Sequence, residues 1–228
     1  MSVYHDTLNE LTALAGKRPA VLVAFSGGKD SLAVLDLCCK VFPRVSAFFS
    51  YTVPGLELNE HWMRLAKTRW GVEVVRQPSC ATMWALKNGI WCDPVAAFDG
   101  LKEYELKEAW AYAMEATGVG LLATGMKDAD GLKRRQFFEN ISRKPDPVWS
   151  NAIHPLRRWR KKDVLNYLRT NGIPVPEQEK GKVTSGVGFN HDSICWLHDT
   201  HPADWKIFTR WFPYAEACIK RREWFGVA

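Results

Sequence analysis

The residues best suited to chemistry form the short segment SGGKDS, residues 26–31. An apolar run of strand length precedes it, and a stretch with helical periodicity follows it. Glycines let the backbone approach a bulky anion, and the start of a helix offers N–H groups and the positive end of its dipole. Lys29 adds a mobile positive charge, while Asp30 suits a first helical turn and can help to hold Mg²⁺. The segment predicts a phosphate or pyrophosphate cradle, with a tight turn that needs glycine as the alternative.

Two widespread phosphate-binding patterns are absent from this segment. The pattern GxxxxGK[ST] separates its glycines by four residues, whereas Gly27 and Gly28 are adjacent and Asp30 follows the lysine. The dinucleotide pattern GxGxxG does not occur there either. The hydroxyls of Ser26 and Ser31 can donate further hydrogen bonds, so a different kind of phosphate loop is expected.

Helical and strand-like segments alternate along the first part of the chain. This alternation predicts an α/β fold with a doubly wound, mostly parallel, Rossmann-like sheet. Ligands of such sheets bind at the carboxyl ends of the strands, where Gly27, Gly28 and Gly125 are expected. The predicted helices are residues 4–16, 30–42, 57–70 and 101–117, and the predicted strands are residues 20–25, 45–51, 71–77 and 119–125.

The second part of the chain is less regular. Residues 151–156 suit a short strand, and residues 161–172 suit a helix. Three glycines and two prolines in residues 173–193 predict a long loop. From Pro202 onward the sequence is helical and rich in Trp and Phe, which indicates core packing or, as the alternative, a surface that stacks nucleic-acid bases.

Length and composition indicate an ordinary globular protein. The chain has 228 residues, of which 46% are hydrophobic and 25% charged. We expect a nucleotide-binding α/β domain at residues 1–172 and a loop with a helical, aromatic-rich extension packed on it at residues 173–228. No apolar run approaches the roughly 18 residues of a membrane span, and no signal-peptide pattern is present, so we expect a cytoplasmic protein without membrane contact.

Positive charge is concentrated in one part of the chain. Residues 133–169 carry eleven Lys or Arg and three acidic residues, a net charge of +8 within a chain whose total is +6. Such a block attracts an anionic partner, either a nucleotide or a nucleic-acid backbone. The alternative is a solvated basic face without a partner.

Three segments carry a resemblance to a known family. SGGKDS resembles the PP-loop of the N-type ATP pyrophosphatases. TGMKDADGLKRR, residues 124–135, is similar to the second nucleotide-site segment of the phosphoadenosine phosphosulfate (PAPS) reductase-like family, and residues 154–174 resemble a later helix of that family. The resemblance covers residues 21–198 and implies an adenine nucleotide alpha hydrolase-like fold.

The family resemblance implies ATP chemistry at this site. An oxygen nucleophile would attack the α-phosphorus, Lys29 would stabilise the leaving pyrophosphate, and Asp30 would position Mg²⁺ or the loop. Arg134 or Arg135 would hold a substrate phosphate or sulfate. The implied nucleotide-binding residues are Phe25, Ser26, Gly27, Gly28, Lys29, Asp30, Ser31, Ser50, Thr124, Gly125 and Arg134.

The segment around Cys195 matches a motif of the family only in part. PAPS reductases carry a late Glu-Cys-Gly-Leu-His motif whose cysteine attacks sulfur, and here Cys195 and His198 keep its spacing without the Glu and Gly. Those reductases usually carry a degenerate loop, whereas SGGKDS is intact. The intact loop favours cleavage of ATP, and a PAPS or APS reductase with Cys195 as its catalytic thiol is the alternative.

The cysteines allow a metal site. None of the six forms a CxxC pair, and thiols or ligands are expected rather than disulfides. Some sulfur-transferring relatives hold an iron–sulfur cluster, and Cys92 and Cys195 fall near the implied ligand positions, with His198 or Cys80 as a substitute third ligand. The spacing of His191, Cys195, His198 and His201 also suits zinc or simple helix capping.

Together these features predict an enzyme that binds ATP with Mg²⁺, cleaves it to an adenylyl intermediate and pyrophosphate, and acts in sulfur transfer. The basic block suits nucleic acid as the acceptor, as in DNA phosphorothioation or tRNA thiolation. A sulfur-donor protein such as a cysteine desulfurase is the expected partner. A non-catalytic nucleotide-binding or nucleic-acid-binding module is the third hypothesis.

Overall fold

The computed structural model describes residues 3–94, 103–143, 151–176 and 188–226. None of the helices in these ranges is both long and apolar enough to cross a lipid bilayer. The elements are, in chain order, α1 (Val3–Ala15), β1 (Ala20–Ala24), α2 (Lys29–Val41), β2 (Arg44–Tyr51), α3 (Glu57–Trp70), β3 (Val74–Pro78), α4 (Cys80–Asn88), α5 (Leu106–Thr117), β4 (Leu122–Ala123), η2 (Asp128–Asp130), α6 (Leu132–Arg143), β5 (Ala152–Ile153), α7 (Lys161–Thr170), α8 (His191–Thr200), α9 (Pro202–Trp211), η5 (Pro213–Ala215) and α10 (Glu216–Phe225).

Within the described residues, the strands form one parallel five-stranded sheet in the order β3-β2-β1-β4-β5. Val23 of β1 lies opposite Ala47 of β2 on one side and Ala123 of β4 on the other. The chain builds outward from β1 to β3 and then returns to place β4 beside β1. This reversal opens a crevice at the carboxyl ends of β1 and β4, where ligands of open α/β sheets bind. The predicted doubly wound α/β sheet is confirmed.

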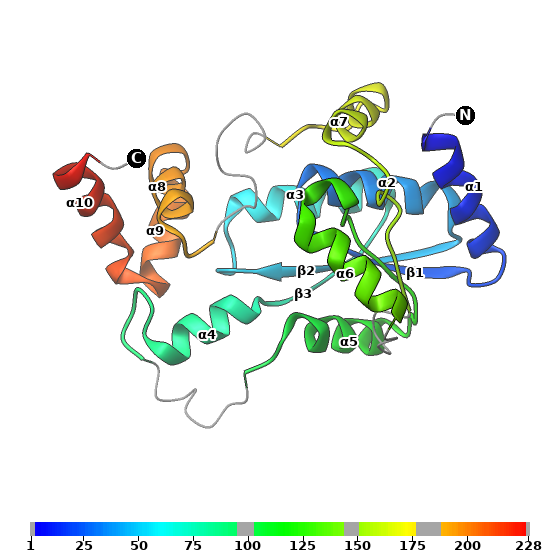
Figure 1. Ribbon diagram of the computed structural model, residues 1–228. Helices are drawn as coiled ribbons and strands as arrows, with labels where there is room; N and C mark the ends of the chain where they lie inside the picture. Colours follow the sequence, from blue (N-terminus) through cyan, green and yellow to red (C-terminus); the bar gives the residue numbers. More distant parts are fainter. Residues whose placement is uncertain (1–2, 95–102, 144–150, 177–187, 227–228) are drawn as a thin grey trace.

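Helices cover both faces of the sheet (Figure 1). Val21 and Val23 of β1 belong to a buried cluster with α1, α2, α3 and α7. Leu22 faces the other way, into a cluster with α5. Because successive strand residues point to opposite faces, a central strand covered on both sides must be apolar at every position, as AVLVA is.

A buried carboxylate links three of the helices that pack on the sheet face formed by Val21 and Val23. Asp36 of α2 is 5% exposed. It accepts hydrogen bonds from Trp70 Nε1 at 2.8 Å and Tyr167 Oη at 2.5 Å, and it pairs with Lys40 at 2.8 Å. Burial raises the pKa of Asp36, but the bonds from Lys40, Tyr167 and Trp70 outweigh burial and hold this pKa below its usual range. The ionised form is therefore the one that links α2 to α3 and α7.

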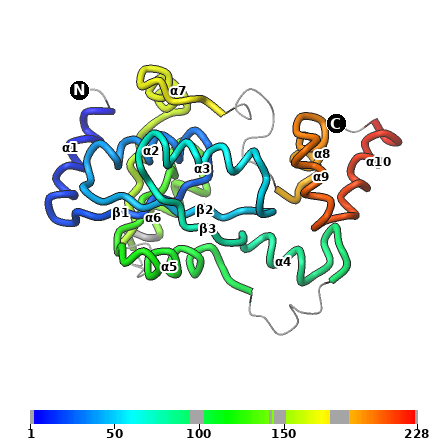
Figure 2. Tube along the Cα trace, turned by 180° about the vertical axis from the view of Figure 1, so that it is seen from behind, coloured from blue at the N-terminus to red at the C-terminus, as the bar shows by residue number. Residues whose placement is uncertain are grey.

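The helices α8, α9 and α10 gather at the end of the molecule remote from α1 (Figures 1 and 2). Phe208 and Phe212 are fully buried in a second core, which also contains Ala85 and Leu86 of α4. The expected helical, aromatic-rich extension is confirmed, and these two aromatic residues pack in the core. Trp224, in contrast, is 77% exposed.

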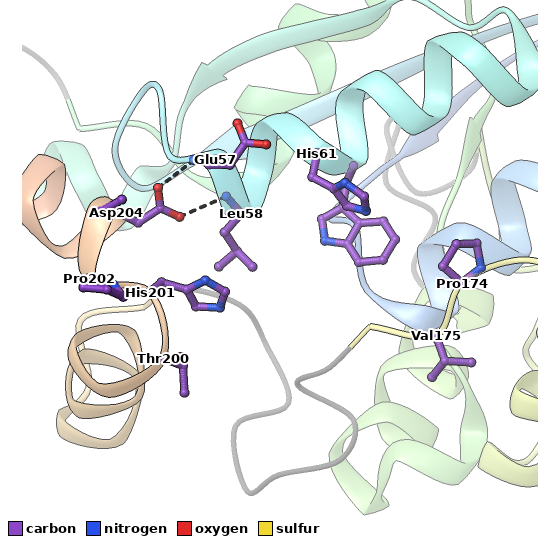
Figure 3. Close-up of a pocket in the computed structure, with 11 residues that line it drawn as sticks. Glu57, Leu58, His61, Pro174, Val175, Thr200, His201, Pro202 and Asp204 are labelled. Carbon is purple, nitrogen blue, oxygen red and sulfur yellow. Dashed lines mark hydrogen bonds between the residues drawn. The ribbon is translucent and has the colours of Figure 1, made fainter.

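Asp204 links this C-terminal helical part to the sheet domain. Its buried carboxylate accepts hydrogen bonds from the backbone N–H groups of Glu57 at 2.7 Å and Leu58 at 2.9 Å (Figure 3). The N-cap of α3, Leu56, has no side-chain cap of its own. Asp204 therefore supplies the missing cap from α9 and places a negative charge at the positive end of the α3 dipole.

Several element boundaries differ from the sequence prediction. The helix predicted at residues 101–117 begins at Leu106, because Glu105 is its N-cap and forms a capping box with Glu108. Residues 101–102 and most of the predicted loop, residues 177–187, lie outside the described residues. The rest of that loop prediction is wrong at its end, because α8 begins at His191, where Asn190 caps it by accepting from Ser193 N.

Two helices were not predicted at all, and one strand is shorter than predicted. The helix α4 follows β3 directly, with Ser79 as its N-cap, and α6 is rich in charge with little apolar periodicity. The strand predicted at residues 119–125 is reduced to Leu122 and Ala123, since only these two residues pair with β1 and β5. The short strand predicted at 151–156 and the helix predicted at 161–172 are present as β5 and α7.

The Asp204 cap predicts a specific destabilisation. Replacing Asp204 with Ala leaves the Glu57 and Leu58 amides of α3 without an acceptor, so we expect a loss of about 1–3 kcal/mol in the free energy of unfolding. Hydrogen exchange of these two amides should accelerate at the same time. The control is Asp192→Ala on α8, whose carboxylate is exposed. Equal exchange rates in Asp204→Ala and wild-type protein would contradict the assignment.

Candidate active site

The loop between β1 and α2 turns sharply at Gly27. Its φ of +71° lies in the left-handed region, and an added Cβ would stand 2.6 Å from Cδ1 of Trp62 in α3. Glycine is therefore required there both by conformation and by space. Gly28 is the N-cap of α2 and makes no side-chain cap bond to the first turn. A bound anion can take the place of that cap, next to the positive end of the helix dipole.

Two serines fix the shape of this loop. The Ser31 hydroxyl donates to the carbonyl of Gly28 at 2.9 Å and accepts from the backbone N–H of Ser26 at 3.1 Å. The Ser26 hydroxyl lies 3.2 Å from that of Ser31. Ser31 is 5% exposed, whereas Ser26 is exposed. Ser31 therefore holds the turn closed, and Ser26 remains at the surface, where it can contact a ligand.

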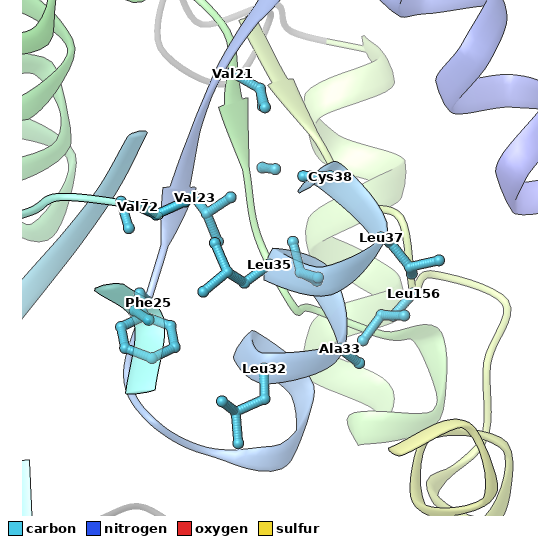
Figure 4. Close-up of a cluster of buried hydrophobic side chains, with 14 of the residues drawn as sticks. Val21, Val23, Phe25, Leu32, Ala33, Leu35, Leu37, Cys38, Val72 and Leu156 are labelled. Carbon is cyan, nitrogen blue, oxygen red and sulfur yellow. The ribbon is translucent and has the colours of Figure 1, made fainter. Parts of the chain in front are cut away.

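Closely packed apolar side chains lie beneath the loop (Figure 4). Leu32 and Leu35 of α2 are fully buried beneath it, together with Val23. Phe25 is 3% exposed, and its ring packs 6.5 Å from that of Phe49. The side chain of Phe25 thus belongs to the core, and only its backbone reaches the sheet edge. This backbone is the part of Phe25 that is available for the predicted nucleotide contact.

A buried lysine joins this loop to the turn after β4. Lys127 is 3% exposed, and its Nζ lies 2.7 Å from Oδ2 of Asp30 and 3.1 Å from Oδ1 of Asp130. Lys29 Nζ lies 3.1 Å from the same Asp30 oxygen. Two ammonium groups and two carboxylates therefore meet at the crevice between β1 and β4. Positive groups held this rigidly can receive the charge of a phosphate without reorganisation.

The predicted residues Thr124 and Gly125 lie at the same crevice. Gly125 packs closely against Asp30: an added Cβ on Gly125 would stand 3.0 Å from the Cβ of Asp30. Thr124 is 3% exposed, and its hydroxyl lies 2.7 Å from Nδ1 of His154 at the end of β5. Burial lowers the pKa of His154 to about 4, with further lowering by the charges of Arg157 and Arg134. His154 is therefore neutral at pH 7.

Three buried polar atoms near the carboxyl edge of the sheet have no hydrogen-bond partner among the described residues: Asp30 Oδ1, Ser50 Oγ and Gln77 Nε2. Ser50 and Gln77 lie opposite each other in the register of β2 and β3, so their side chains share one face. Unsatisfied buried polar groups are costly, and a ligand with donors and acceptors would satisfy them. Ser50 was expected to bind the nucleotide, and Gln77 lies opposite it in the register.

The two predicted arginines contact different partners. Arg134 is exposed, and its guanidinium lies 3.1 Å from Sδ of Met126. Arg135 donates from Nε to the carbonyl of Asp128 at 3.3 Å and lines a hollow of about 310 Å³ with three further arginines. Both arginines thus lie beside the crevice, and neither belongs to the group formed by Lys29, Asp30 and Lys127.

The structure places Cys195 away from this crevice. Cys195 is 6% exposed in the C-terminal core with Cys92 and Cys218, and burial raises its pKa. Its Sγ lies 3.8 Å from Nε2 of His191. A reactive thiol requires exposure and a lowered pKa, and Cys195 has neither. His198 instead bonds to Asp199 through Nδ1 at 2.8 Å.

The described residues do not assemble the expected metal site. Nowhere in residues 3–94, 103–143, 151–176 and 188–226 do three His, Cys, Asp or Glu side chains lie in an arrangement that fits a metal ion. Cys92 and Cys195 share a core, whereas the Nδ1 of His198 is engaged by Asp199 at 2.8 Å. Cys92, Cys195 and His198 therefore do not come together as one ligand set in the described structure, and an iron–sulfur cluster or zinc at these residues stays a prediction.

Comparison with known proteins identifies the family. The model of the phosphoadenosine phosphosulfate reductase domain matches residues 20–181, from the start of β1 to beyond α7. The chain therefore belongs to the phosphoadenosine phosphosulfate reductase domain family, and the resemblance seen in the sequence is confirmed. No curated protein sequence matches the chain significantly.

The crystal structure of phosphoadenylyl-sulfate (PAPS) reductase from Candida auris, a phosphate complex, is similar at 19% sequence identity with a TM-score of 0.49. The similarity covers 78% of this chain and 89% of that chain.

Sequence reasoning missed four residues of this site: Trp62, Gln77, Lys127 and His154. Lys127 follows the strand-ending Thr124 and Gly125 by two residues, and this position at the carboxyl edge was the available signal. Trp62 and Gln77 approach from α3 and β3, and nothing near them in the sequence indicates the contact.

Substitution of Gly27 should destabilise the protein more than substitution of Gly55, another glycine with a positive φ. Gly27→Ala introduces both left-handed strain and a clash with Trp62, whereas Gly55→Ala introduces strain alone, because nothing lies within 4 Å of a Cβ there at φ +78°. We expect Gly55→Ala to cost about 1 kcal/mol and Gly27→Ala about 1–3 kcal/mol more in the free energy of unfolding. Denaturant titration of both variants measures the difference, and equal costs would contradict the packing of Trp62 on the loop.

The lowered pKa of His154 predicts a pH dependence of stability. As pH falls from 7 towards 4, the unfolded chain protonates His154 near pH 6.5, whereas the folded chain takes up this proton only near pH 4. The free energy of unfolding should therefore fall across this window. In His154→Asn the fall between pH 6.5 and 4 should be smaller, which denaturant titrations at several pH values would measure. An unchanged pH slope in the variant would contradict the neutral, buried state of His154.

Proposed function

We propose that this protein binds ATP at the carboxyl edge of its sheet and cleaves it between the α and β phosphates to adenylylate an acceptor. The observation that carries the proposal is the arrangement of the 26–31 loop. Gly27 and Gly28 leave the start of α2 open, and Lys29 and Lys127 bring two ammonium groups to the same point. This arrangement suits the pyrophosphate part of ATP, because backbone amides, a helix dipole and two cations all face one place.

The chemistry follows from this placement. An acceptor oxygen forms a bond to the α-phosphorus, the bond from that phosphorus to the α–β bridging oxygen breaks, and the electron pair leaves with pyrophosphate. Lys29 and Lys127 neutralise the charge that grows on the leaving group, while the turn fixed by Ser31 holds it in line. The outer sulfur of a persulfide on a donor protein such as a cysteine desulfurase then forms a bond to the acceptor atom that carries the adenylylated oxygen, and AMP leaves with that oxygen and its electron pair. A second thiol of the donor protein cleaves the remaining S–S bond by forming a disulfide, which leaves the sulfur on the acceptor.

The residues present fit a Mg²⁺ ion bound together with the nucleotide. Asp30 Oδ1 is buried without a hydrogen-bond partner in the described part of the chain, and Mg²⁺ prefers carboxylate and phosphate oxygens. Asp30 would supply one protein ligand, with phosphate oxygens and water as the others. When bound, the ion supplies charge neutralisation for the phosphates.

The proposal has a direct product test. With α-labelled ATP and Mg²⁺ we expect labelled AMP or adenylylated acceptor together with pyrophosphate. Lys29→Ala should reduce this cleavage by about 10²–10³-fold, because it removes a charge that acts on the leaving group. The control Lys17→Ala removes an exposed lysine in the turn between α1 and β1, remote from the loop, and should leave the rate unchanged.

The product identifies which hypothesis fails. ADP as the only nucleotide product would overturn cleavage between the α and β phosphates. Nucleotide affinity without turnover, with and without nucleic acid, would favour a non-catalytic binding module instead.

The family match also favours a second candidate, a PAPS or APS reductase with Cys195 as its thiol nucleophile. The burial of Cys195 and its raised pKa speak against this role. Release of sulfite from PAPS in the presence of thioredoxin, abolished by Cys195→Ser, would establish the reductase. We expect no such release.

A further inference from the structure

Four arginines line one hollow at the carboxyl edge of the sheet. The hollow has a volume of about 310 Å³ and lies between the turn after β4 and the turn after β5. Asp128 is the only carboxylate among the residues described as lining it. The lining residues are Asp128, Ala129, Arg135, Arg157, Arg158, Trp159 and Arg160.

A second hollow of about 400 Å³ adjoins the first and shares Asp128, Arg157 and Arg158 with it. Arg157 Nε lies 3.3 Å from both carboxylate oxygens of Asp128, and Arg158 pairs with Glu10. Among the described residues, no carboxylate forms an ion pair with Arg135 or Arg160. The two hollows together therefore keep a surplus of positive charge that their own carboxylates do not neutralise.

One of these exposed arginines, Arg157, is held in place by its neighbours. The Arg157 guanidinium lies over the Phe138 ring at 4.5 Å, and the Arg157 carbonyl accepts from the backbone N–H of Asp128 at 3.0 Å. Trp159, two residues further along, is 1% exposed and donates from Nε1 to the Thr7 hydroxyl at 2.9 Å. A pre-organised guanidinium loses little conformational entropy when it binds a phosphate through two parallel N–H groups.

The hollows also lie beside the proposed ATP site. Lys127 reaches Asp30 in the 26–31 loop, and the next residue, Asp128, lines both hollows. An anion held by Arg157 and Arg158 would therefore lie along the same edge of the sheet as the nucleotide.

We propose that the two hollows bind successive backbone phosphates of a nucleic-acid strand, which makes nucleic acid the acceptor class. The statement about the acceptor rests on the proposed ATP chemistry, whereas the binding surface does not. A single free phosphate would occupy one hollow and use one or two guanidinium groups. The positive charge extends further, to the exposed Lys161 and Lys162 at the start of α7, as expected for a chain of phosphates.

The test is binding of a fluorescent single-stranded DNA of about 20 nucleotides without ATP, measured by anisotropy over a range of salt concentrations. Engagement of four phosphates predicts a slope of log K against log salt near −3. Arg158→Gln with Arg160→Gln should weaken binding about tenfold or more and make the slope shallower by about 1.4, since two phosphate contacts are lost. The charge-matched control, Lys17→Gln with Lys67→Gln, lies at the opposite edge of the sheet and should bind like wild type. Circular dichroism of each variant verifies folding.

Three results would overturn the proposal. The first is equal DNA affinity in wild type and the folded Arg158 and Arg160 double variant, which is independent of any ATP assay. The second is displacement of DNA by adenosine 3′,5′-bisphosphate with the same affinity as by unlabelled strand, which would assign the hollows to a free nucleotide phosphate. The third is equal competition by polyglutamate at matched charge, which would indicate an acidic protein partner. Failure of ATP cleavage with intact DNA binding would overturn only the proposed function.

Discussion

The buried contact between Lys127 and Asp30 is the interaction on which the site depends. Taking an ammonium group and a carboxylate out of water is costly, and only close pairing offsets that cost. Here Lys127 Nζ lies 2.7 Å from Asp30, and Gly125 leaves room for the Asp30 side chain to pack against the turn after β4. The contact spans the crevice where the strand order reverses, and so it sets the position of the 26–31 loop relative to β4.

Around that contact, the end of each strand contributes different residues to the crevice. The end of β1 leads into the glycine turn before α2, the end of β4 leads to Lys127, and the arginines come from α6 and from the turn after β5. The ends of β2 and β3 contribute Ser50 and Gln77, whose buried polar atoms have no partner among the described residues. The family match stops at residue 181, before α8, so the C-terminal helices lie outside the matched domain. Asp204 joins these helices to the domain by capping the N-terminus of α3.

The sequence predicts those elements that depend on residues close together in the chain. The apolar strand before Ser26 and the helical spacing after it predict the loop and the sheet that carries it, because both depend on neighbouring residues. Lys127 and Gln77 were missed because their partners lie about a hundred and about thirty residues away, respectively, in the chain. Cys195 shows the converse: its spacing to His198 fits a reactive motif, yet packing against α10 buries it.

The central claim is that the amides at the start of α2 hold the pyrophosphate part of ATP. Amide hydrogen exchange at residues 28–31 tests it directly, since a bound phosphate protects the N–H groups that it accepts from. ATP and pyrophosphate should each slow exchange of these amides about tenfold or more, whereas AMP should not. Equal protection by AMP, or no protection by pyrophosphate, would contradict it.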